Sequence, residues 1–152
     1  MNFSRLKFPR LFAFATLLLA SAAASAVEFR AIGAAPAVLY DAPTAKGTKV
    51  FVAPRGMPVE LILTYGEWSK VRDAGGGLSW VESKALVSKR NVVVSVANAK
   101  VRSSADDAAA VVFSADKGVL LELAEPVASG WIKVRHRDGQ AGYVKASDVW
   151  GE

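Results

Sequence analysis

The side chains with the clearest chemical potential are two tryptophans, each placed two positions before a lysine. Trp68 precedes Lys70, and Trp131 precedes Lys133. Residues two apart in a strand lie on the same face, so each indole is expected beside a cation. Two interpretations stand. Either the indoles cap a small apolar core, or their ring edges line a groove for a peptide or a sugar.

Patterns for catalysis and metal binding are missing from the sequence. It has no cysteine, and therefore no thiolate nucleophile and no disulfide. His136 is the single histidine and is expected to be an exposed strand residue, without the second imidazole that a metal site usually needs. No serine-nucleophile elbow, phosphate-binding loop or zinc-protease helix motif is present. We therefore expect no catalytic residue, no metal and no cofactor.

Residues 1–26 have the pattern of a cleavable secretory signal peptide. The first ten residues hold three cations and no acid, and residues 11–20 form an apolar run. This run is too short to cross a hydrocarbon core, which takes about 20 helical residues. Ala24-Ser25-Ala26 is a small-residue cleavage pattern, so the cut is predicted after Ala26, with an uncleaved anchor as the alternative. Cleavage predicts a periplasmic or secreted protein without stable membrane insertion.

The remaining chain, residues 27–152, has little net charge. Three of the 19 basic residues and none of the 14 acids lie in the predicted signal peptide, so the net charge falls from +5 to +2. A surface that binds nucleic acid needs a concentrated basic face, whereas these charges are dispersed. Nucleic acid is therefore not an expected partner.

This part of the chain divides into two halves that align with each other. Gly56 aligns with Gly118 at an offset of 62, and Trp68 with Trp131 at an offset of 63. A repeat of this length indicates duplication of a small domain. The predicted units are domain 1, residues 27–88, and domain 2, residues 89–152.

Each half has the pattern of about five short strands joined by glycine turns. Asp138-Gly139 predicts a hairpin because both residues tolerate positive φ, and Gly75-Gly76-Gly77 predicts a looser equivalent. Trp80 and Tyr143 follow these turns, where partial exposure makes them candidates for ligand binding. Closing the strands removes exposed edges, so we expect an all-β protein of two small barrels in tandem.

At these residues the sequence resembles the bacterial SH3-like (SH3b) domain family. The family pattern is an early Val-Arg segment, a glycine-led strand, a Gly-Trp-x-Lys-Val strand and an Asp-Gly hairpin. The second half has all four, at Val101-Arg102, 118–123, 130–134 and 138–144. The first half departs from it with Leu39-Tyr40 and Leu78-Ser79-Trp80. The resemblance implies two SH3-like barrels that recognise peptidoglycan or peptide, or that position a partner domain against the cell wall.

The resemblance also draws attention to one loop. In SH3-type barrels the loop after the first strand lines the ligand face, which makes Tyr40 the leading groove candidate. Its counterpart Arg102 is expected to pair with a ligand carboxylate, or with Asp106 or Asp107. The complete set of candidate ligand-binding residues is Tyr40, Trp68, Trp80, Arg102, Trp131 and Tyr143.

Three classes of function can be weighed on these observations. We expect a non-catalytic exported binding module that recognises peptide or peptidoglycan in the cell envelope. The alternative is a periplasmic interaction or scaffold protein that serves an envelope protein. An enzyme is disfavoured, because it would need a catalytic site assembled between the barrels from residues that show no catalytic pattern.

Overall fold

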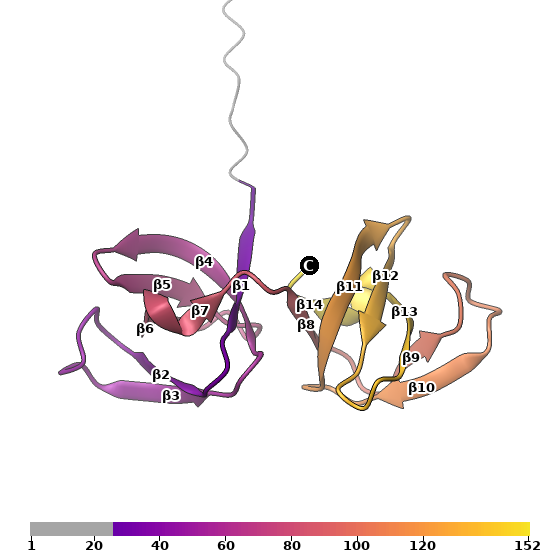
Figure 1. Ribbon diagram of the computed structural model, residues 1–152, viewed down its shortest axis with the longest axis horizontal. Helices are drawn as coiled ribbons and strands as arrows, with labels where there is room; N and C mark the ends of the chain where they lie inside the picture. The colour runs from indigo at the N-terminus through magenta and orange to yellow at the C-terminus, as the bar shows by residue number, and fades with distance from the viewer. Residues whose placement is uncertain (1–25) are drawn as a thin grey trace, which may run out of the picture.

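The computed structural model describes residues 26–152, so the predicted signal peptide falls almost entirely outside the described residues. The described chain forms two seven-stranded antiparallel sheets that lie side by side, with the C-terminus between them (Figure 1). Within this part of the chain, no helix has the length and apolarity needed to cross a membrane.

The two sheets have the same strand order. The first runs β3-β2-β6-β5-β4-β1-β7 and the second β10-β9-β13-β12-β11-β8-β14, so each strand has its counterpart seven labels later. This identity of topology supports the internal duplication. The first sheet contains β1 (Glu28–Ile32), β2 (Ala37–Tyr40), β3 (Lys49–Ala53), β4 (Pro58–Tyr65), β5 (Trp68–Arg72), β6 (Leu78–Glu82) and β7 (Leu86–Val87). The second contains β8 (Asn91–Val94), β9 (Ala99–Arg102), β10 (Val111–Ala115), β11 (Leu120–Ala128), β12 (Trp131–Arg135), β13 (Ala141–Lys145) and β14 (Val149–Trp150).

One short 3-10 helix precedes the last strand of each sheet. These helices are η1 (Ser83–Ala85) and η2 (Ala146–Asp148). The all-β architecture is confirmed, but each sheet remains open, in contrast to the predicted closed barrels. The end strand β7 has only two residues, and both pair with β1, which leaves the far edge of β3 without a strand partner among residues 26–152.

Each sheet encloses its own aliphatic core. In domain 1 the largest fully buried side chains are Ile32 and Leu39, and in domain 2 they are Leu121 and Ile132. No residue belongs to both clusters. Strict alternation places every second residue of β5 and β12 inward and leaves Trp68 and Trp131 outward.

The two hairpin turns share one hydrogen-bond pattern. The Asp73 N–H donates to the Gly77 carbonyl at 3.0 Å, and the His136 N–H donates to the Gln140 carbonyl at 2.8 Å. The turn of three glycines is therefore no looser than the Asp-Gly turn, contrary to expectation. Carboxylates cap backbone N–H groups in both, because Asp73 accepts from Gly77 and Asp138 accepts from Gln140.

Candidate ligand-binding faces

The outward face of β2, β5 and β6 brings together the three predicted site residues of domain 1. Tyr40 packs edge-on against Trp68, with ring centroids 5.5 Å apart and planes at 87°. In the sheet, Tyr40 also lies opposite Trp80. All three side chains are half-buried, so their rings form an ordered surface that remains accessible to a ligand. We call Tyr40, Trp68, Lys70 and Trp80 the aromatic face.

Lys70 adds a positive charge to this surface. Its ammonium group lies 5.9 Å from the centroid of the Trp80 ring. Within residues 26–152, no carboxylate lies within 4.0 Å of that ammonium. The residue opposite Lys70 in the neighbouring strand is Leu63, whose side chain is 45% exposed. The aromatic face therefore offers rings and an unneutralised cation, and the exposed aliphatic side chain of Leu63 lies next to it.

The corresponding face of domain 2 gathers the other three predicted site residues. Tyr143 lies opposite Arg102 in the sheet, as Trp80 lies opposite Tyr40. Trp131 lies opposite Lys145, whose ammonium is 5.8 Å from the centroid of the indole ring. We call Arg102, Trp131, Lys133, Tyr143 and Lys145 the polar face, because three of its five members are cations.

The cations of the polar face are held by partners within the protein. Lys133 forms an ion pair with Glu125 at 2.7 Å, and this carboxylate raises the pKa of Lys133 above its usual value. Lys145 forms an ion pair with Asp107 at 2.7 Å. Arg102 donates a hydrogen bond to the Ala109 carbonyl at 2.8 Å. These ion pairs neutralise two of the three cations of the polar face, whereas the hydrogen bond to a carbonyl leaves the charge of Arg102 in place.

Arg102 does not make the internal ion pair that was one of the two pairings expected for it; the other, with a ligand carboxylate, stays a prediction. Among the described residues, it forms no ion pair with Asp106 or Asp107, because Asp107 is engaged by Lys145. Arg102 and Trp131 nevertheless line one hollow of about 380 Å³, which the paired Lys145 and Asp107 also line. A ligand entering this hollow would have to compete with that pair.

Three other expectations need correction. Trp68 and Trp131 do not cap the cores, because the aliphatic residues next to them in β5 and β12 fill the inward positions. Tyr40 is the last residue of β2 and does not belong to the loop that follows. His136 is half-buried in the turn after β12, where it packs against Phe113 at 5.9 Å and pairs with Asp138.

The sequence profile of the family described as bacterial SH3 domain matches the chain twice, at residues 33–88 and 95–151. The chain belongs to the bacterial SH3 domain family. The matches cover most of each sheet, so the two bacterial SH3 domains stand in tandem, as the resemblance implied.

Comparison with whole proteins adds little to this assignment. No curated protein matches the chain. The solved structures similar to it include NlpC2 from Trichomonas vaginalis, at 12% identity and a TM-score of 0.39, and NlpC1 from the same organism, at 13% identity and a TM-score of 0.40. The matches cover 84% and 88% of this chain, which spans 49% of the length of each of those structures.

Proposed function

We propose that this protein is an exported, non-catalytic binding module of the periplasm, and that the aromatic face of domain 1 binds peptidoglycan. The observation that supports the proposal is the grouping of two indoles and a phenol around Lys70, a cation with no carboxylate within 4.0 Å among residues 26–152. The predicted signal peptide supplies the argument for export.

The chemistry of peptidoglycan suits such a surface. One side of a sugar ring carries only C–H groups, and it can cover the flat face of an indole while the hydroxyl groups stay in water. The peptide stems of peptidoglycan carry carboxylates, for which Lys70 is the available cation on this face. Since Tyr40 and Trp68 are already packed against each other, these two rings lose little side-chain freedom when a ligand binds.

The direct test is co-sedimentation of the protein with purified peptidoglycan sacculi, using the Tyr40→Ala/Trp80→Ala variant and the wild type. Binding by the wild type should persist up to about 1 M salt, where the Debye length is only about 3 Å, because ring contacts do not depend on charge. Removal of two central aromatic contacts should weaken binding by roughly 30-fold or more, as is typical of interface hot spots.

The second domain provides a matched control. Arg102→Ala/Tyr143→Ala removes the residues at the same two positions of domain 2. This variant should sediment with sacculi nearly as the wild type does. Wild-type protein that stays in the supernatant would rule out peptidoglycan as the ligand, and equal losses in both variants would rule out the assignment of binding to domain 1.

A protein partner is the second candidate, and one feature of domain 1 favours it. The edge strand β3 has Val50, Phe51 and Val52 exposed in succession, at 58%, 49% and 59% of their surface. An apolar edge strand can accept a further strand from another protein. Crosslinking in cells through a photoreactive residue at position 51 should then capture one reproducible envelope protein, whereas diffuse labelling would count against this candidate.

A further inference from the structure

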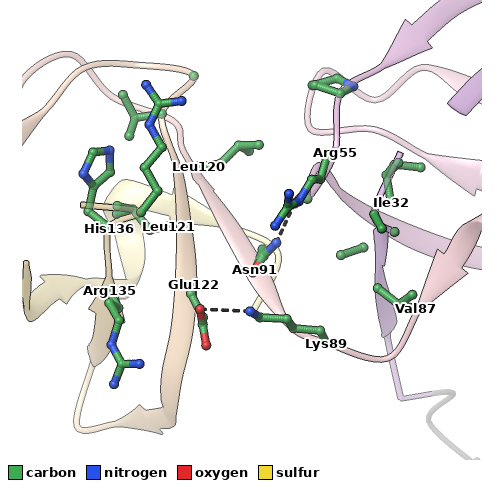
Figure 2. Close-up of a pocket in the computed structure, with 18 residues that line it drawn as sticks. Ile32, Arg55, Val87, Lys89, Asn91, Leu120, Leu121, Glu122, Arg135 and His136 are labelled. Carbon is green, nitrogen blue, oxygen red and sulfur yellow. Dashed lines mark hydrogen bonds and ion pairs between the residues drawn. The ribbon is translucent and has the colours of Figure 1, made fainter. Parts of the chain in front are cut away.

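A cleft of about 830 Å³ lies between the two domains, on a different part of the molecule from the aromatic and polar faces. Its volume is within the range of ligand sites, about 300–1,000 Å³. Domain 1 contributes Ile32, Arg55 and Val87 to its lining, and domain 2 contributes Leu120 and Arg137. Figure 2 shows Arg55 reaching into the gap from one side while His136 and Leu120 stand on the other.

Polar and aromatic contacts across the interface hold the two walls of this cleft in place. The Asn91 side-chain amide donates a hydrogen bond to the Gly56 carbonyl at 2.8 Å. Phe29 of β1 packs edge-on against Trp150 of β14, with ring centroids 4.9 Å apart, and the Arg90 guanidinium lies 5.6 Å from the centroid of the Phe29 ring. The cleft is therefore formed by contacts within the chain and is present before any ligand arrives.

The charged groups in the cleft that have no ion-pair partner among the described residues are positive. Its one acidic lining residue, Glu122, is paired with Lys89 at 3.0 Å. For the lining residues Arg55, Arg135 and Arg137, the described chain offers no carboxylate within 4.0 Å. Guanidinium groups bind carboxylates with two parallel hydrogen bonds, and these three come from both walls of the cleft.

We propose that the cleft binds an acidic segment of a partner polypeptide, with carboxylates on the arginines and apolar side chains on the floor. The floor argues for a peptide rather than a small inorganic anion, since Val87, which is 39% exposed, and the half-buried Leu120 would gain no partner from phosphate. The arginines also come from opposite walls, which suits carboxylates spaced along an extended chain. This site is separate from the aromatic face, so either one can fail without the other.

The test measures fluorescence anisotropy of a labelled peptide of three Glu-Leu repeats with protein purified from cells that express the whole 152-residue sequence. The wild type should bind this peptide and should bind the Gln-Leu counterpart at least about tenfold more weakly, because hydrogen bonds to charged groups are the stronger ones. The Arg55→Gln/Arg137→Gln variant should lose affinity for the acidic peptide by a similar factor. Both side chains are exposed, so the fold should survive.

A second variant distinguishes binding of the peptide in the cleft from attraction of the peptide by the net charge of the protein. Lys46→Gln/Lys100→Gln removes the same charge from positions that do not line the cleft, and its affinity should stay within about twofold of the wild type. Equal losses in the two variants, equal binding of both peptides, or no binding by the wild type would each overturn the proposal. Displacement of the peptide by inorganic phosphate at matched concentration would also overturn it, in favour of a small-anion site.

Discussion

The outward faces of the two domains occupy the same positions of the same sheet, yet they differ in what they can bind. Lys70 lies opposite Leu63 in domain 1, whereas its counterpart Lys133 lies opposite Glu125 and is ion-paired with it at 2.7 Å. Domain 1 thus presents a free cation among aromatic rings, while domain 2 pairs two of its three cations with its own carboxylates. After duplication, the inward-facing residues of both domains continued to form an aliphatic core, while the outward-facing residues diverged into two kinds of surface.

The inward positions also differ, but in a way that preserves packing. The buried Ser69 shares a hydrogen bond with Ser83, 2.7 Å between the two oxygens. Ile132 is buried at the corresponding point of domain 2, and Ala146 packs against the same core. A hydrogen-bonded pair and an apolar pair are alternative ways to leave no buried polar group without a partner. The core thus accepts either pair, provided that the side chains fill the space and every buried polar group is hydrogen-bonded.

The largest effect is expected at Gly142, where β13 packs too closely against β9 to leave room for a side chain. A Cβ added there would lie 2.5 Å from the Arg102 carbonyl oxygen and 2.9 Å from Val101, and a backbone atom cannot move aside as a side chain can. Gly142→Ala should therefore force β9 and β13 apart and lower the free energy of unfolding by about 3 kcal/mol. Chemical denaturation of the full chain measures this directly.

The same position in domain 1 supplies the control. Ser79 carries a Cβ and an oxygen there and is 5% exposed, so the first sheet already accommodates a side chain. Ser79→Ala should change the free energy of unfolding by about 1 kcal/mol or less. If Gly142→Ala changed the free energy of unfolding as little as Ser79→Ala, the two domains would not differ in the room they leave for a side chain at this position.

A smaller effect should follow from transplanting one residue between the outward faces. Leu63→Glu places a carboxylate opposite Lys70, as Glu125 is placed opposite Lys133. A surface ion pair contributes up to about 1 kcal/mol, so affinity for sacculi should fall by at most roughly fivefold. Leu63→Gln is the neutral control, and binding should recover in Leu63→Glu at high salt. A loss that is equal in the two variants would mean that Leu63 itself contacts the ligand.

Sequence reasoning recovered the parts of this molecule that depend on local pattern. Alternation placed each tryptophan on the same face as a lysine, and the Asp138-Gly139 signal located a hairpin that the structure contains. The pairing of Lys145 with Asp107 was missed, because it joins residues far apart in the chain. The open sheet edge was also missed. It depends on β7 having only two residues, which composition does not reveal.

Register was the second obstacle to predicting the site. A β-bulge shifts the pairing between Leu61 and Leu63, and another between Leu123 and Glu125. A one-residue shift exchanges the residues that face a given neighbour. The residue opposite Lys70 or Lys133 therefore could not be read from spacing alone, although aligning the two halves shows a leucine and a glutamate at comparable places.

The smallest predicted effect concerns the two hairpin tips, where domain 2 has Asp138 and domain 1 has Gly75 in the aligned turn. The Gln140 backbone N–H, then the Gln140 side chain and His136, lower the pKa of Asp138 from 3.8 to about 2. A carboxylate whose pKa is lower in the folded state than in the unfolded state stabilises the fold at pH values above its unfolded-state pKa. That contribution is lost as the pH falls from about 4 to about 2. Asp138→Asn should make the urea midpoint fall less steeply over this pH range than it does in the wild type. Identical pH dependences of Asp138→Asn and the wild type would show that the hairpin of domain 2 is no more sensitive to acid than the rest of the chain.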